Sequence, residues 1–99
     1  MNVIFLSRCS IAYLRRTGAY GVENRAVMER LLALAGQAGL LGPEAAILSI
    51  AWDDPACTPP AACRYDACLV LQEGQTLSGA DVRYGTLPGG RYAVFPIPH

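Results

Sequence analysis

The sequence contains no lysine and a single histidine, His99, so its positive charge comes almost entirely from arginine. Eight arginines balance eight acidic residues, and the formal net charge is zero. A nucleic-acid binder needs a surplus of cations to release counterions from phosphates, so we expect no nucleic-acid partner. The lack of an internal histidine also argues against a nucleophilic triad, and we expect no catalytic residue.

Long apolar runs are absent as well. Every apolar stretch is interrupted by Gly, Arg or Ser well short of the roughly 20 residues that a membrane-spanning helix needs. The opening MNVIFLSRC is apolar but lacks a charged start, a long apolar region and a cleavage site of small residues. It therefore predicts a first strand and not a signal peptide, and we expect a cytoplasmic protein with no membrane partner.

Four cysteines are present, but none forms a C-x-x-C pair. Five residues separate Cys57 from Cys63, four separate Cys63 from Cys68, and Cys9 stands far from the others. This spacing is a weak basis for a zinc site, and we expect no metal and no cofactor. Because 53% of the 99 residues are hydrophobic, the chain can bury a core without disulfides. We expect a single domain, residues 1–99, with free and mostly buried thiols.

Hydrophobic periodicity predicts one helix and several strands. Apolar residues recur at helical spacing from about residue 22 to 38, which is typical of an amphipathic helix. Strands are predicted at 2–17, 46–53 and 64–72. The segment VRYGTLPGGRYAVF, residues 82–95, predicts a strand, a Pro-Gly-Gly turn or bulge, and a second strand. The predicted fold is α+β, an antiparallel sheet with one helix packed on it: a strand-helix-strand-strand module plus one further strand or hairpin.

The stretch AWDDPACTPPAACRYDAC, residues 51–68, joins two of these strands. Asp53 and Asp54 precede a proline, which favours a turn with an aspartate capping backbone N–H groups over a catalytic carboxylate pair. Arg64 and Asp66 share one face of the following strand. They could pair with each other, or either could pair with Asp53 across the hairpin.

Four pieces of sequence in a fixed order, DDP, TP, RYDAC and GGRYAVF, form a specific pattern, although each alone is weak. Together with AYLRRTGAYG before the helix, they resemble the GyrI-like family. That family comprises the effector-binding domains of AraC-type and MerR-type transcription regulators and relatives such as DNA gyrase inhibitory protein. The resemblance covers nearly the whole chain. It implies two strand-helix-strand-strand modules related by a pseudo-twofold axis, with the ligand in a groove between them.

The chain departs from that family pattern in its second half. It resembles the first module plus the opening strand of the second, so the late-strand carboxylate that binds organic cations in the family has no counterpart here. A half-length domain would leave a sheet edge and one strand face uncovered. We expect a homodimer that completes the two-module fold. The alternative is a fragment or a truncated reading frame.

The resemblance also implies an aromatic-lined groove, where flat or cationic ligands are held by ring stacking and cation–π attraction. The candidate ligand-binding residues are Tyr20, Asn24, Trp52, Tyr65, Asp66 and Tyr92. For each aromatic residue, ordinary packing is the competing interpretation. Asn24 could equally be the helix N-cap, and Asp66 could either supply the missing carboxylate or form a structural ion pair.

Three functions remain open at this stage. The first is a stand-alone effector-binding module for small, drug-like, amphipathic aromatic molecules, cationic ones included. The second is a hydrolase of reactive small molecules, as in some GyrI-like proteins, which would need a carboxylate placed to activate water. The third is a protein-interaction module similar to a gyrase inhibitor. We favour ligand binding without catalysis.

Overall fold

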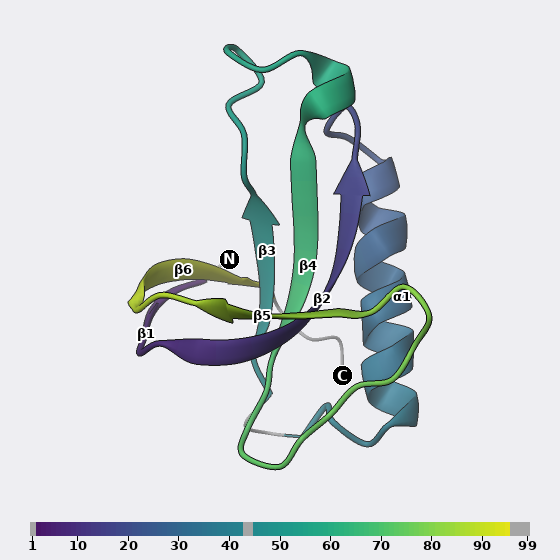
Figure 1. Ribbon diagram of the computed structural model, residues 1–99, viewed down its shortest axis with the longest axis vertical. Helices are drawn as coiled ribbons and strands as arrows, with labels where there is room; N and C mark the ends of the chain where they lie inside the picture. Colours follow the sequence, from purple (N-terminus) through teal and green to yellow (C-terminus); the bar gives the residue numbers. More distant parts are fainter. Residues whose placement is uncertain (1, 43–44, 96–99) are drawn as a thin grey trace.

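The computed structural model describes residues 2–42 and 45–95, and within them it contains one α-helix and six strands. The helix is α1 (Glu23–Gln37). The strands are β1 (Asn2–Leu6), β2 (Cys9–Thr17), β3 (Ile47–Ala51), β4 (Arg64–Val70), β5 (Arg83–Leu87) and β6 (Gly90–Phe95), with a 3₁₀ turn at Pro60–Ala62. Figure 1 shows the helix lying along one side of the strands. The predicted α+β class, one helix on antiparallel strands, is confirmed.

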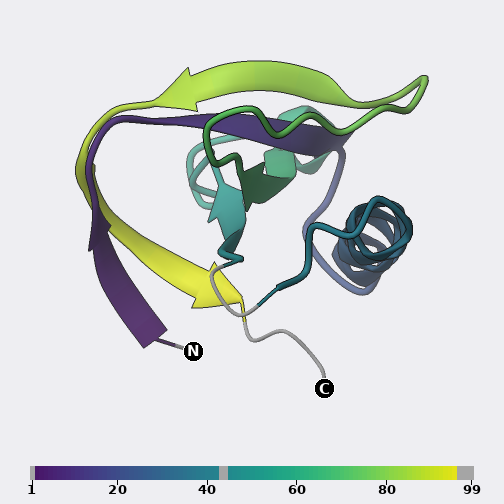
Figure 2. The same cartoon turned by 90° about the horizontal axis from the view of Figure 1, so that it is seen from below.

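The six strands form one antiparallel sheet in the order β1-β6-β3-β4-β2-β5. The β1–β6 and β2–β5 pairs make a single long ribbon, since Leu6 faces Gly90 and Cys9 faces Leu87 in one uninterrupted register. Figure 2 shows this ribbon turning a corner between its two halves. A Cβ on Gly89 would lie 3.3 Å from the Leu6 carbonyl oxygen, so glycine permits the close backbone approach at the corner.

Residues 82–95 form one bent strand. The alternative that the sequence allowed, a hairpin formed by the two halves of this segment, is wrong. In the described sheet β5 pairs with β2, and β6 pairs with β1 and β3, so no ladder joins β5 to β6. Pro88 and Gly89 therefore mark a bend in a continuing strand. The partner strand bends at the same place, between β1 and β2, which keeps the register across the corner.

Helix α1 covers one face of the sheet, over β2 and β4. Its buried residues Met28, Leu31 and Ala35 recur at helical spacing and pack in one cluster with Ala67 and Leu69 of β4. The predicted helix extends one residue beyond the observed one at each end. No helix among the described residues is long and apolar enough to cross a membrane.

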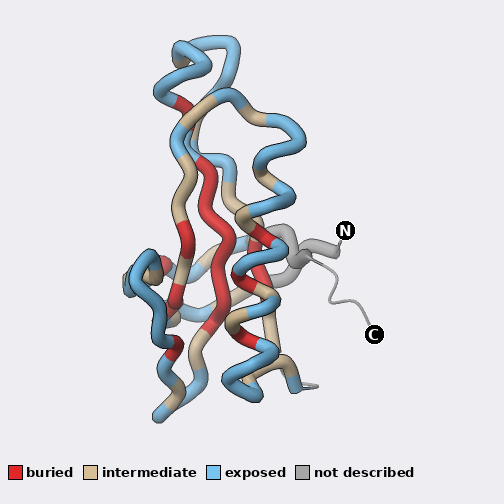
Figure 3. Tube along the Cα trace, turned by 90° about the vertical axis from the view of Figure 1, so that its right-hand side faces the viewer, coloured by how far each residue is buried: buried red, intermediate tan, exposed pale blue. Residues whose placement is uncertain are grey.

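Strand β4 is buried on both of its faces, as the continuous buried run in Figure 3 shows. Its odd-numbered residues, Tyr65, Ala67 and Leu69, belong to the helix-side core. Cys68 and Val70 point the other way, into a second core that includes Leu87 of the bent ribbon. The ribbon thus covers one face of β4, and the helix covers the other.

The connection from β4 to β5, residues 71–82, is fixed at three points. The side chain of Leu77 is buried in the helix-side core. The Tyr84 hydroxyl accepts a hydrogen bond from the Leu77 backbone N–H at 3.1 Å and donates one to the Leu77 carbonyl. Arg30 of α1 binds Asp81 through two hydrogen bonds of 2.6 and 2.7 Å. This connection is called the β4–β5 loop below.

Candidate functional site

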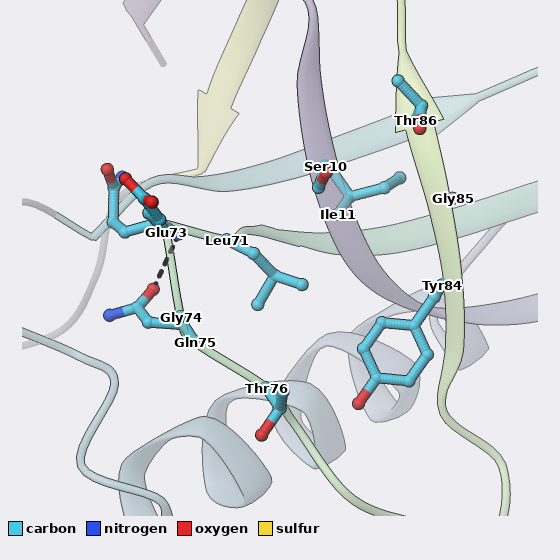
Figure 4. Close-up of a pocket in the computed structure, with 11 residues that line it drawn as sticks. Ser10, Ile11, Leu71, Glu73, Gly74, Gln75, Thr76, Tyr84, Gly85 and Thr86 are labelled. Carbon is cyan, nitrogen blue, oxygen red and sulfur yellow. Dashed lines mark hydrogen bonds between the residues drawn. The ribbon is translucent and has the colours of Figure 1, made fainter.

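A pocket of about 610 Å³ lies where the β4–β5 loop meets β2 and β5. Small-molecule sites typically have volumes of roughly 300–1,000 Å³, so a drug-sized ligand would fit. The residues that line it include Ser10, Ile11, Leu71, Glu73, Gln75, Thr76, Tyr84 and Thr86. Figure 4 shows these side chains arranged around the hollow.

Tyr84 supplies the aromatic surface of this pocket. Its side chain remains exposed, yet its hydroxyl is held by both backbone polar groups of Leu77. A ring tethered in this way loses little further freedom when a ligand binds. Figure 4 shows the Tyr84 ring and the Leu71 side chain extending into the hollow from opposite sides. The pocket therefore offers one oriented aromatic and one aliphatic surface.

Among the described residues that line the pocket, Glu73 is the one that carries a charge. The Gln75 side-chain oxygen accepts a hydrogen bond of 2.9 Å from the Gln72 backbone N–H, which holds the turn that carries Glu73. Hydroxyl groups of Ser10 and Thr76 complete a polar rim. One negative charge among neutral donors and acceptors favours neutral or positively charged ligands.

Trp52 and Asp66 lie together on the sheet face opposite α1, and Arg15 of β2 joins them. The buried Asp66 carboxylate accepts two hydrogen bonds from Arg15, both 2.8 Å, and one of 2.6 Å from the Trp52 indole N–H. The hydrogen bond to Asp66 raises the pKa of the Arg15 guanidinium. Of the pairings left open by the sequence, that of Arg64 with Asp53 is confirmed. A pairing of Asp66 with Arg64 or Asp53 is wrong, because Arg15 faces Asp66 directly across the β2–β4 ladder.

Tyr20 and Asp53 close the base of the loop between β3 and β4. Asp53 accepts a 2.8 Å hydrogen bond from the Arg64 backbone N–H and pairs with the Arg64 guanidinium at 3.0 Å. These guanidinium and backbone hydrogen bonds lower the pKa of Asp53. The Tyr20 hydroxyl accepts from the Asp53 N–H at 3.0 Å and donates to the Arg64 carbonyl at 2.8 Å. Asp54 accepts from the Ala56 N–H at 2.9 Å, so the predicted aspartate turn is confirmed.

Asn24 and Tyr65 lie on the helix side of the sheet. The Asn24 side-chain oxygen accepts a hydrogen bond from Arg16 at 2.9 Å, and α1 has no side-chain cap at its first turn, so Asn24 is not the N-cap. The Tyr65 hydroxyl is hydrogen-bonded to the Ser49 hydroxyl at 2.7 Å, and burial raises the Tyr65 pKa. Asn24, Ser49 and Tyr65 border a smaller hollow of about 290 Å³.

The six predicted binding residues therefore do not meet in one groove. Three of them lie on the helix side of the sheet: Tyr20, Asn24 and Tyr65. Two lie on the opposite face: Trp52 and Asp66. The backbone of Tyr92 pairs with Ile4 in the β1–β6 ladder, but its side chain lies outside the described part of the structure. None of the other five lines the 610 Å³ pocket.

Sequence reasoning missed Tyr84 and Glu73. The alternation along β5 places Tyr84 and Thr86 on one face, and this pattern is readable from the sequence. The strand that pairs with β5 could not be predicted from the sequence. The pocket depends on that pairing, in which Ala12 of β2 faces Tyr84 and Ser10 faces Thr86. Glu73 carries no local signal beyond its place in a polar loop.

The four cysteines are free. Cys63 and Cys68 are buried, Cys9 is partly buried and Cys57 is exposed, and burial raises the pKa of the Cys68 thiol. Among the residues that the structure describes, no three His, Cys, Asp or Glu side chains gather into a possible metal site.

Comparisons with known proteins give a family and several relatives. The family model described as "GyrI-like small molecule binding domain" matches residues 2–99. The "SPbeta prophage-derived putative transcriptional regulator YosT" of Bacillus subtilis (strain 168) is 43% identical over 96 residues, which cover 95% of this chain and 62% of that protein. The "Probable transcriptional regulator YgiV" of Escherichia coli (strain K12) is 49% identical over 45 residues, 46% of this chain and 28% of that protein. The chain thus spans less than two thirds of the length of these relatives.

Proposed function

This chain belongs to the GyrI-like family of small-molecule-binding domains, and we propose that it binds amphipathic aromatic molecules, cationic ones in particular, in the pocket beside the β4–β5 loop. The observation that carries the proposal is the composition of this pocket. It joins a tethered aromatic ring, Tyr84, to an aliphatic side chain, Leu71, and a carboxylate, Glu73.

Each of these groups contributes a different part of the recognition. A flat ligand buries apolar surface against Leu71 and stacks on the Tyr84 ring, and a positive charge near that ring adds cation–π attraction. Glu73 is exposed, so water and salt screen its charge and its contribution to affinity is modest. We therefore expect ring contact to set most of the affinity and Glu73 to set the preference for cations.

A thermal-shift titration with 9-aminoacridine, a planar cation at neutral pH, and with acridine, its uncharged analogue, tests this. A ligand that binds only the folded state raises the unfolding midpoint by mass action. We expect both compounds to raise the midpoint, 9-aminoacridine at lower concentration. Tyr84→Leu should weaken both, and Glu73→Gln should remove the difference between them.

Glu29→Gln is the matched control, because Glu29 is an exposed carboxylate of α1 and does not line the pocket. It changes the net charge by the same amount as Glu73→Gln and should leave both titrations unchanged. A midpoint that neither compound moves would contradict the proposal and favour the protein-interaction alternative.

Catalysis is not part of the proposal. Among the residues that the structure describes, those that line the pocket include neither a histidine nor a cysteine. Of the two carboxylates considered as a catalytic pair, Asp53 is held by Arg64 and Asp54 accepts a hydrogen bond from the Ala56 N–H. Asp66 is held by Arg15. A hydrolase would need a carboxylate placed to activate water, and the aspartates held in these contacts are not free to do so. Glu73 is assigned here to charge preference alone.

The proposal extends to a regulatory role and to self-association. The names of the relatives describe transcriptional regulators, which supports an effector-binding module.

The edge strand β1 supports a homodimer. Its residue Phe5 is 79% exposed, so this edge presents apolar surface that a second copy could cover. Light scattering coupled to size exclusion would show a dimer, and Phe5→Ser should shift it toward monomer. Four free thiols suit the reducing cytoplasm.

A further inference from the structure

A second cluster of polar and aromatic side chains lies on the sheet face away from α1. Three neighbouring chain segments contribute one residue each: Arg15 from β2, Asp66 from β4 and Trp52 just after β3. The cluster is separate from the pocket of the proposed function, since Ser10 and Tyr84 of that pocket point to the opposite side of the ladder.

Asp66 is not available to a ligand cation. One of its carboxylate oxygens accepts from Arg15 Nε, and the other accepts from Arg15 Nη2 and from Trp52 Nε1. The residue is 1% exposed. A buried carboxylate held this way by a guanidinium is neutralised locally, and removing that partner would leave an uncompensated charge. A positively charged ligand would have to displace Arg15 to reach it.

Arg15, by contrast, has hydrogen-bond donors to spare. A guanidinium carries five N–H groups, and Asp66 takes two of them. Within the described part of the chain, no acceptor is recorded for Nη1. The Arg15 side chain is 27% exposed, so its remaining N–H groups can be reached from solvent. Asp66 and the Tyr13 ring, 5.5 Å from the guanidinium carbon, hold the group in one orientation.

Trp52 provides an apolar surface beside these donors. It is 44% exposed, and its indole N–H is fixed on the same carboxylate that fixes Arg15. An exposed indole whose polar end is already satisfied offers its ring face for stacking. Because Arg15 and Trp52 bind the same carboxylate, the ring face of Trp52 lies beside the unused N–H donors of Arg15.

We propose that the Arg15–Trp52 face is a binding site for flat aromatic carboxylates. The ligand carboxylate accepts hydrogen bonds from the unused N–H groups of Arg15, and its ring stacks on Trp52. This ligand class is opposite in charge to that of the pocket, so the inference goes beyond the proposed function. The buried Asp66 acts as a positioning residue that holds both contacting groups.

The chain has one tryptophan, so its single indole N–H resonance in a ¹H–¹⁵N spectrum reports on this face alone. The experiment titrates ¹⁵N-labelled protein with 2-naphthoate and, separately, with 2-naphthylmethylammonium. We expect 2-naphthoate to shift the Trp52 indole resonance saturably. The ammonium compound should bind there about tenfold more weakly or not at all, since it offers no acceptor for a charge-assisted hydrogen bond. An equal or stronger shift with the ammonium compound would overturn the inference.

Variants of Arg15 sharpen the test. Arg15→Lys keeps the positive charge but loses the planar set of donors, and it should weaken 2-naphthoate binding about tenfold. Arg25→Lys, at an exposed arginine of α1 on the opposite side of the sheet, is the matched control and should leave binding unchanged. Because Arg15→Gln alone would strand a buried carboxylate, the double variant Arg15→Gln/Asp66→Asn replaces the ion pair by neutral amides. It should lose the preference for 2-naphthoate, and wild-type affinity in this folded variant would also overturn the inference.

The two proposals, the pocket and the Arg15–Trp52 face, are tested independently. If acridines do not raise the unfolding midpoint but 2-naphthoate shifts the indole resonance, the proposed function is wrong and the carboxylate site stands. If the acridines bind and 2-naphthoate leaves the indole resonance in place, the carboxylate site is wrong and the pocket stands.

Discussion

Arg30 on helix α1 and Asp81 at the end of the β4–β5 loop form a two-point ion pair, with hydrogen bonds of 2.6 and 2.7 Å. They are 51 residues apart in sequence. Asp81 lies only three residues before Tyr84, so the pair ties the helix to the segment that leads into the pocket's aromatic wall.

Asp81→Asn should therefore weaken ligand binding more than it weakens the fold. Both partners of the pair are about half exposed, and such pairs contribute little to stability. We expect a nearly unchanged unfolding midpoint and a several-fold loss of 9-aminoacridine affinity, measured by calorimetric titration. Glu29→Gln serves again as the control for the change in net charge. Equal affinities of Asp81→Asn and wild type would show that the pair does not position the pocket.

Leu77→Ala should destabilise the protein strongly. The Leu77 side chain is 1% exposed within the helix-side core, and truncating a fully buried leucine costs about 2–5 kcal/mol. Leu32→Ala, at a partly buried helix position packed on the same core, should cost about 1 kcal/mol. Urea unfolding measures both. Similar losses for the two variants would mean that Leu77 does not anchor the loop.

Gly89→Ala should destabilise the corner of the ribbon by about 1–3 kcal/mol, because the new Cβ would press on backbone atoms that cannot move aside easily. Gly42→Ala is the matched substitution, since a Cβ there meets nothing within 4 Å. Its effect should be neutral or slightly stabilising, through lower entropy of the unfolded chain. The comparison is made by chemical denaturation, and a harmless Gly89→Ala would contradict the close approach.

The lowered pKa of Asp53 predicts that the protein loses stability in acid. This pKa is lowered from 3.8 by the Arg64 hydrogen bonds, so the folded state takes up this proton at lower pH than the unfolded state. The Asp53–Arg64 contribution is fully present above pH 3.8 and declines as the pH falls through the lower folded value. Urea midpoints measured from pH 7 down into this range should fall less steeply for Asp53→Asn than for wild type. Parallel curves would rule out this role.

The cysteines should react with iodoacetamide in a definite order. Cys57 is exposed, whereas Cys63 and Cys68 are 1% and 0% exposed, and burial disfavours the reactive thiolate of Cys68. Mass spectrometry of the native protein should find Cys57 modified first. Modification of Cys68 should require denaturant, and its rapid labelling in buffer would contradict the packing of the second core.

Much of the fold could be predicted from the sequence because its signals are local. The helix shows in the spacing of Met28, Leu31 and Ala35, and the strand β4 in the short apolar run from Ala67 to Val70. The aspartate turn at Asp54 follows from the residue type and the proline after it.

The candidate site could not be predicted to the same degree because its contacts are distant in sequence. Arg15 and Asp66 are 51 residues apart, and only the β2–β4 register shows that they face each other. The pocket depends on the pairing of β2 with β5 and on the loop between β4 and β5. The Pro-Gly-Gly sequence correctly predicted a change of chain direction. It did not tell a hairpin from a corner in a continuing ribbon, because both use the same residue types.

The continuous ribbon has a consequence for the order in which the protein assembles. Strand β1 pairs with β6, which is synthesised much later, so Ile4 cannot pair until Tyr92 has been made. Contacts this far apart in sequence fold slowly, because loop closure precedes the gain from pairing. Until β6 emerges, β1 is an unpaired strand that carries the apolar side chain of Phe5. The nascent chain should therefore be most prone to aggregation just before its synthesis reaches residue 95.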